Sequence, residues 1–102
     1  MYNMKTLTIC CSMRFAKGMQ AIAFDLETRH GFNVLQRVYG DGEHLTPKQR
    51  AKLAAAHAQK IALSDGIYVV DIDGYVGQST QNEIALARAQ GKEVIFHTGF
   101  YR

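Results

Sequence analysis

The chain has 102 residues, a net charge of +3 and 47% hydrophobic residues, which is enough apolar material for one domain with its own core. Its Lys and Arg residues are scattered and are not interleaved with aromatic residues, so a nucleic-acid groove is a weak interpretation. No signal peptide is visible and no apolar run approaches the length of a membrane span. We therefore expect a single cytoplasmic domain over residues 1–102. The adjacent Cys10 and Cys11 are awkwardly spaced for a disulfide, and we interpret them as buried thiols in a reducing compartment.

The spacing of the apolar residues alternates along the chain between the periods of a strand and of a helix. The strand-like stretches are residues 5–11, 33–38, 66–71 and 93–97. The helix-like stretches run from Phe15 to Leu26, from a cap at Thr46 to about Ser64, and from about Thr80 to Gln90. This alternation predicts an α/β fold: a doubly wound, flavodoxin-like or Rossmann-like parallel sheet of four to five strands with helices on both faces. The simplest strand order is 2-1-3-4.

The segment from residue 65 to residue 94 carries the strongest indication of a site. An apolar run ends in Asp71 and Asp73, and a glycine-broken loop then leads to a helix with Glu83 in its expected first turn. The carboxyl edge of an open parallel sheet is where ligands bind, and a helix start offers N–H groups to an anion. In the expected strand order, Cys11-Ser12-Met13-Arg14 and the loop from Asp71 to Glu83 flank one crevice.

Three blocks of sequence carry a resemblance to a known family. They are Cys11-Ser12-Met13-Arg14 after the first strand, Ser64-Asp65 before the third strand, and the glycine-bearing loop into Glu83-Ile84-Ala85 with Gly91-Lys92 beyond it. In these blocks, and in their order and spacing from Thr6 to about Phe96, the chain resembles the nucleoside 2-deoxyribosyltransferase superfamily. That superfamily includes the 2'-deoxynucleoside 5'-monophosphate N-hydrolases.

The resemblance implies a role for each matching residue. Glu83 corresponds to the nucleophile of the family, and Ser12 and Arg14, with Met13 between them, hold a 5'-phosphate or line the sugar pocket. His57 stands where members carry an aspartate, and Gly77 stands where transferases often carry a second acid. The chain is also short for this family, so we expect a second copy to close the pocket in a homodimer or higher homo-oligomer.

Cleavage of the N-glycosidic bond passes through an oxocarbenium-like state, and a carboxylate such as Glu83 can attack the anomeric carbon. The alternative for Glu83 is purely structural, because Thr80-x-x-Glu83 also matches a capping box. Asp73 is the other catalytic candidate, since it can hydrogen-bond a sugar hydroxyl or the departing base. Both Asp71 and Asp73 also fit ordinary turn capping, which we favour for Asp71.

The remaining candidates also have two interpretations each. Tyr75 can stack on a base or pack against a neighbouring subunit, and Ser79 and Thr80 can bind a phosphate or serve as caps. His57 can shuttle a proton or orient a hydroxyl, but it also fits a buried position between Leu53 and Ile61.

The sequence predicts neither a metal nor a cofactor. The four histidines are dispersed, there is no CxxC or HxxxH spacing, and no GxGxxG follows the first strand. The function that the resemblance implies is cleavage of a (2'-deoxy)nucleoside or its 5'-monophosphate, with transfer of the sugar to water or another base, and we expect it to need no cofactor. The alternative is a non-catalytic nucleotide-binding sensor, which His57 and Gly77 in place of acids support.

Overall fold

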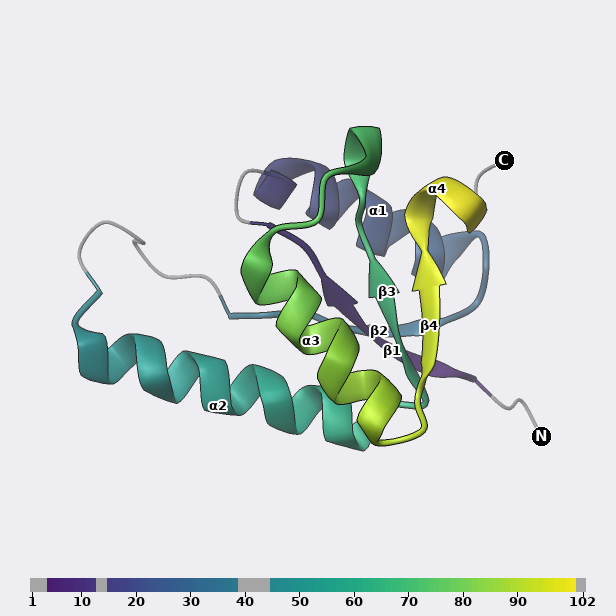
Figure 1. The fold of residues 1–102 in the computed structure, drawn as a ribbon. Coiled ribbons are helices and arrows are strands. Elements are labelled where there is room, and N and C mark those ends of the chain that lie inside the picture. Colours follow the sequence, from purple (N-terminus) through teal and green to yellow (C-terminus); the bar gives the residue numbers. More distant parts are fainter. Residues whose placement is uncertain (1–3, 13–14, 39–44, 101–102) are drawn as a thin grey trace.

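A computed structural model describes residues 4–12, 15–38 and 45–100. Their strands are β1 (Thr6–Cys10), β2 (Asn33–Leu35), β3 (Gly66–Val69) and β4 (Glu93–Phe96). All three neighbouring pairs are parallel and the order is β2-β1-β3-β4, which confirms the α/β parallel sheet and the strand order predicted from the sequence (Figure 1). Four strands, and not five, form the sheet within the described ranges.

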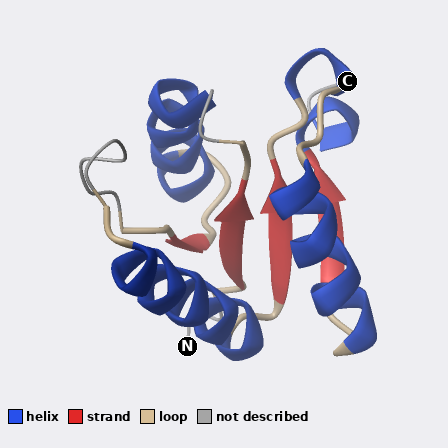
Figure 2. Ribbon diagram, turned by 60° about the vertical axis from the view of Figure 1, so that its left-hand side comes forward, coloured by secondary structure: helices blue, strands red, loops and turns tan. Residues whose placement is uncertain are grey.

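Helices cover both faces of the sheet, as Figures 1 and 2 show. The helix α1 (Ala16–Thr28) packs with Met19, Ala23 and Leu26 on one face, against side chains such as Leu7 and Tyr68. The helices α2 (Pro47–Leu63) and α3 (Gln78–Ala89) cover the opposite face. The side chains buried there are those of Cys10, Ile61, Ile67, Val69, Ile84 and Ala87. No helix of the described chain is both long enough and apolar enough to cross a membrane.

The start of α2 agrees with its sequence signals. The Thr46 side chain accepts a hydrogen bond from the Gln49 backbone N–H at 3.1 Å, and the Gln49 side chain accepts one from the Thr46 N–H at 2.9 Å. Pro47 occupies the first helical position, where its missing N–H costs nothing. The capping box predicted at Thr46 is therefore confirmed.

The start of α3 differs from the prediction. The helix begins at Gln78 with Gly77 at its N-cap, two residues before the expected start at Thr80. Thr80 is buried on the same stripe as Ile84 and Ala87, which follow it at helical spacing and face the sheet. The capping box between Thr80 and Glu83 is therefore wrong, and Glu83 lies in the second turn of α3 rather than the first.

The ends of β3 and β4 also differ from the prediction, because both strands stop before the predicted last residue. Strand β3 ends at Val69, and residues Ile72–Gly74 form a short 3-10 turn instead of continuing the strand alternation. Strand β4 ends at Phe96, where the short helix α4 (His97–Phe100), which the sequence did not indicate, begins. The Asp71 carboxylate fixes this helix by accepting hydrogen bonds from the Thr98 N–H at 2.9 Å and the Thr98 hydroxyl at 2.7 Å. Asp71 thus has a structural role, but it holds the start of α4 and does not cap the turn before Gly74 as predicted.

Substitution of Gly66 tests the pairing of β3 with β4. Gly66 lies opposite Glu93, and a Cβ atom at Gly66 would lie 2.6 Å from the Glu93 carbonyl oxygen. Because backbone atoms cannot move aside cheaply, we expect Gly66→Ala to lower the free energy of unfolding by about 1–3 kcal/mol. Gly18→Ala in α1 is the matched control, since the nearest atom to its added Cβ is 3.9 Å away. Urea denaturation should show the control to be at least as stable as the wild type. Equal stability of the two variants would contradict the described strand pairing.

Candidate functional site

The loops that follow β1 and β3 lie side by side at the carboxyl edge of the sheet. A Cβ atom placed on Gly77 would lie 3.8 Å from the Ser12 Cβ atom, and 3.5 Å from the Tyr75 hydroxyl. The Tyr75 ring also contacts the Phe15 ring edge-to-face, with 5.9 Å between centroids. The predicted neighbourhood of these two loops is therefore confirmed. Met13 and Arg14, both predicted to contact substrate, lie outside the described residues.

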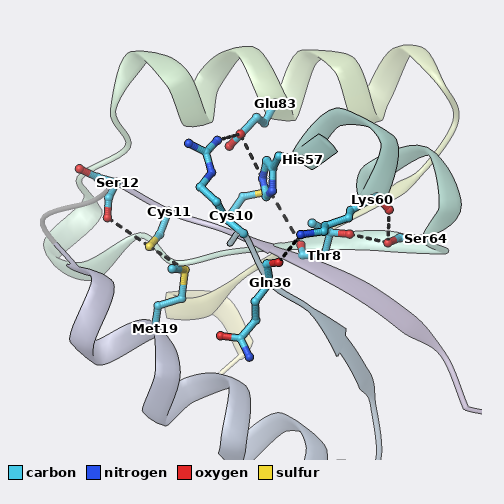
Figure 3. Close-up of polar contacts among 11 residues, drawn as sticks. Thr8, Cys10, Cys11, Ser12, Met19, Gln36, His57, Lys60, Ser64 and Glu83 are labelled. Atoms are coloured by element: carbon cyan, nitrogen blue, oxygen red, sulfur yellow. Dashed lines mark hydrogen bonds and ion pairs between the residues drawn. The ribbon is translucent and has the colours of Figure 1, made fainter. Parts of the chain in front are cut away.

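Four polar side chains from four separate segments meet beside these loops. We call them the Glu83 cluster: Cys10 from β1, Arg37 from the chain after β2, His57 from α2 and Glu83 from α3. The Glu83 Oε2 atom lies 3.0 Å from an Arg37 guanidinium nitrogen and 3.1 Å from His57 Nε2. The same His57 Nε2 atom lies 3.6 Å from the Cys10 sulfur. Figure 3 shows Glu83 and His57 pointing toward each other, with Cys10 next to His57.

The packing of α2 on the sheet places His57 in this cluster. His57 lies one turn before Ile61, which is fully buried against the sheet, and its own side chain is only 3% exposed. Lys60 donates a hydrogen bond from Nζ to the Gln36 carbonyl at 2.7 Å, which ties α2 to the segment that carries Arg37. The predicted burial of His57 is confirmed, but its ring faces a carboxylate and a thiol rather than an apolar core alone.

The ion pair between Arg37 and Glu83 is mostly shielded from solvent. The Glu83 side chain is 13% exposed and the Arg37 side chain 29%, so their ion pair is largely removed from water. Breaking such a pair on one side leaves an uncompensated charge, which is costly. The Nδ1 atom of His57 is buried and has no hydrogen-bond partner among the described residues. Glu83 is therefore held by its Oε2 atom, and its role is not that of a helix cap.

A small cavity opens next to Glu83. It has a volume of about 190 Å³ and is lined by the polar residues Arg37, Ser79, Asn82 and Glu83 together with apolar side chains of α2 and α3. A larger, open depression of about 500 Å³ lies toward α1 and also touches Arg37, but Glu83 does not line it. We take the smaller cavity as the candidate site, because it contains the carboxylate.

Of the other predicted site residues, one lines the cavity and two do not. Ser79 lies in the first turn of α3 and lines the cavity. Thr80 does not, because it is 2% exposed and its hydroxyl is enclosed in the interior. Asp73 is exposed in the turn after β3, with a left-handed backbone at φ 55°, and no hydrogen bond or ion pair joins it to the described residues of the cluster. Asp71 and Asp73 thus do not share a face, because the strand has ended before them.

Two members of the cluster were not among the predicted site residues. Arg37 follows a strand of only three residues, and Cys10 reads locally as an ordinary buried strand residue. No motif links them to Glu83, because the contacts join segments 46 or more positions apart in the sequence. The strand order itself was the one available signal, since it brings the chain after β2 next to the end of β1.

The two thiols have different surroundings on the two faces of the sheet. Burial, and secondarily the charge of Glu83, raises the pKa of Cys10 well above its usual range. The same two causes raise the pKa of Cys11 to about 11. The Cys11 sulfur lies 3.0 Å from the Met19 sulfur, on the α1 side (Figure 3). Neither thiol is an activated nucleophile.

This environment predicts slow alkylation of both thiols. Iodoacetamide reacts with the thiolate, and the rise of the Cys11 pKa from 9.0 to about 11 lowers the thiolate fraction at neutral pH. We expect Cys11 in the folded protein to react about a hundredfold more slowly than in urea, with Cys10 slower still. Mass spectrometry of timed samples measures both rates. Fast modification of Cys10 in the folded protein would contradict the burial of the cluster.

Comparisons of the chain with protein-family models, with curated proteins and with solved structures gave no match.

Proposed function

We propose that this protein cleaves the N-glycosidic bond of a (2'-deoxy)nucleoside or its 5'-monophosphate, with Glu83 as the nucleophile. The sugar passes to water or to a second base. The observation that carries the proposal is the position of Glu83, a mostly buried carboxylate held by Arg37 and His57 at the wall of a small cavity that Ser79 and Asn82 also line. The nature of the reaction comes from the family resemblance of the blocks around Ser12, Ser64 and Glu83.

In the first step, the carboxylate attacks the anomeric carbon of the sugar and forms a glycosyl ester. The bond from that carbon to the base nitrogen breaks, and its electron pair leaves with the base. Arg37 and His57 both contact Oε2, so they fix the carboxylate in one orientation, and we assign the attack to Oε1. In the second step, water or another base attacks the same carbon and frees Glu83.

The departing base takes its proton from water, and we assign to Asp73 a hydrogen bond to that base or to a sugar hydroxyl. Its carboxyl is exposed on the loop that follows β3, the loop that also carries Tyr75. Tyr75, which is 39% exposed, offers a ring on which a base can stack. In this scheme His57 is a positioning residue for Glu83, because its ring faces that carboxylate from the interior.

We favour a monophosphate over a free nucleoside. Ser79 lies in the first turn of α3, where N–H groups of the helix start are available to an anion. Ser12 lies across from Gly77 at the same end of the helix, and Arg14 follows it in the sequence. A second copy of the chain would close this open edge, and we therefore expect a homodimer at least. We place the reaction in the cytoplasm, where two free thiols stay reduced.

A second function, nucleotide binding without catalysis, has one specific observation in its favour. The Oε2 atom of Glu83 already contacts both Arg37 and His57, and such contacts stabilise a carboxylate and weaken it as a nucleophile. A protein that retained only the anion site would then act as a sensor of nucleotides.

One experiment separates the two functions. The purified protein is incubated with a panel of ribo- and deoxynucleosides and their 5'-monophosphates, and free base is measured by chromatography. Release of base from at least one deoxynucleoside monophosphate is the expected result. Thermal stabilisation by nucleotides without any base release would favour the sensor. The absence of both base release and thermal stabilisation would contradict both functions.

A further inference from the structure

Three members of the Glu83 cluster are metal-ligand side chains of three different kinds. The sulfur of Cys10, Nε2 of His57 and a carboxylate oxygen of Glu83 all lie within 4.8 Å of one another. They form the one such group among the described residues. They come from β1, α2 and α3, so the folded core fixes their relative positions before any ligand arrives. This grouping was invisible in the sequence, where 47 positions separate Cys10 from His57.

The spacing of these atoms matches a tetrahedral metal ion. Zinc binds sulfur at about 2.3 Å, nitrogen at about 2.0–2.1 Å and carboxylate oxygen at about 2.0–2.2 Å. At tetrahedral angles, these bond lengths put nitrogen and sulfur about 3.6 Å apart, and nitrogen and oxygen about 3.4 Å apart. The observed separations are 3.6 Å between His57 Nε2 and Cys10 Sγ, and 3.1 Å between His57 Nε2 and Glu83 Oε2. The third separation, from Cys10 Sγ to the Glu83 oxygen, is within 4.8 Å, whereas tetrahedral angles require about 3.6 Å. The Glu83 side chain must therefore move toward Cys10 to complete the geometry.

The route to the cluster is also defined. Cys10 and His57 are 1% and 3% exposed, whereas Glu83 lines the cavity between α2 and α3. A metal ion entering this cavity meets the carboxylate first and then the deeper nitrogen and sulfur. The cavity side leaves a fourth coordination position to water or to a ligand, as in zinc sites with three protein ligands.

We propose that Cys10, His57 and Glu83 bind a divalent transition metal ion, with Zn²⁺ as the best match to one sulfur, one nitrogen and one oxygen ligand. On binding, the Cys10 thiol loses its proton to the buffer and the thiolate sulfur donates an electron pair to the metal, without any change of oxidation state. Mg²⁺ and Ca²⁺ do not fit, because they prefer oxygen ligands throughout.

This site bears on the proposed function through Glu83. A bound ion occupies the carboxylate that attacks the sugar, so Zn²⁺ acts as an inhibitor that competes for the nucleophile. Metal binding itself does not depend on the proposed function, since it needs only the geometry of the three ligands. Arg37 weakens metal binding, because its positive charge lies 3.0 Å from the same carboxylate and repels the ion.

The test uses Co²⁺ as a spectroscopic probe for the zinc site in the 102-residue chain. A thiolate bound to Co²⁺ gives a charge-transfer band in the near ultraviolet, and d–d bands of high intensity indicate tetrahedral coordination. We expect the wild type and Cys11→Ser to show both signals, and Zn²⁺ to displace Co²⁺ from each. Cys10→Ser should lose the thiolate band, and His57→Gln should bind at least about tenfold more weakly. Arg37→Gln should bind severalfold more tightly, because a like charge is removed.

The outcomes are distinct from those of the activity assay. Absence of a thiolate band in the wild type, or a band that survives in Cys10→Ser but not in Cys11→Ser, would overturn the metal site. Circular dichroism of each variant checks the fold, and His57→Gln and Arg37→Gln test the site without altering either cysteine. Base release without metal binding would leave the proposed function intact, and metal binding without base release would contradict only the enzyme.

Discussion

Glu83→Gln is expected to lower the rate of base release by about three orders of magnitude or more, because an amide cannot form the glycosyl ester. The fold should survive. The glutamine retains an oxygen that can accept a hydrogen bond from Arg37, and we expect the free energy of unfolding to fall by about 1–3 kcal/mol as the charged contacts weaken. Single-turnover assays and urea denaturation of the same preparation measure both quantities.

The matched control for this substitution is Glu93→Gln. It makes the same chemical change at an exposed carboxylate, which pairs with Lys5 at the other end of the sheet. Its base release should stay within twofold of the wild type. If Glu83→Gln also kept its base release within a few-fold, Glu83 would be a structural partner of Arg37 and His57, and another group would carry the reaction.

Arg14→Ala has the second large expected effect, which depends on the ligand. Arg14 comes two positions after Ser12 in the sequence, and Ser12 faces Gly77; a guanidinium suits bidentate contact with a phosphate. We expect the variant to bind a nucleoside 5'-monophosphate about ten- to a hundredfold more weakly, with the matching nucleoside nearly unaffected. Calorimetric titration with each ligand of the pair gives the two affinities.

Lys17→Ala serves as the control for charge alone, because Lys17 is an exposed cation in the first turn of α1, three residues farther along. A loss confined to Arg14→Ala and to the monophosphate is the result that the proposal requires. Equal losses for nucleoside and monophosphate would show that Arg14 does not contact the phosphate.

Much of the fold was predictable because each element carries its own periodic pattern. The continuous apolar run from Ile67 to Val70 is typical of a strand covered on both faces, and it is fully buried between α1 on one side and α2 and α3 on the other. Strand order followed from short right-handed crossovers, which leave few arrangements.

The errors arose where long-range packing overrides a local pattern. Thr80 resembles a helix cap in the sequence, yet its position on the buried stripe with Ile84 places the helix start at Gln78. The helix α4 depends on the Asp71 carboxylate, 27 positions away from Thr98, so no local signal announces it. The same limit applies to the site, where Glu83 and His57 were found as candidates but their partners Arg37 and Cys10 were not.

The central claim is a covalent bond between Glu83 and the sugar, and intact-protein mass spectrometry tests it most directly. The wild type is incubated with a deoxynucleoside monophosphate that carries fluorine at the 2' position of the sugar, which slows the second step more than the first by disfavouring the oxocarbenium-like state. We predict a mass increase equal to one fluorinated sugar phosphate, located by peptide mapping to Glu83 and absent in Glu83→Gln. Two results would contradict the account. One is release of the base from the nucleotide while the mass of the protein stays unchanged, and the other is an adduct on any other residue.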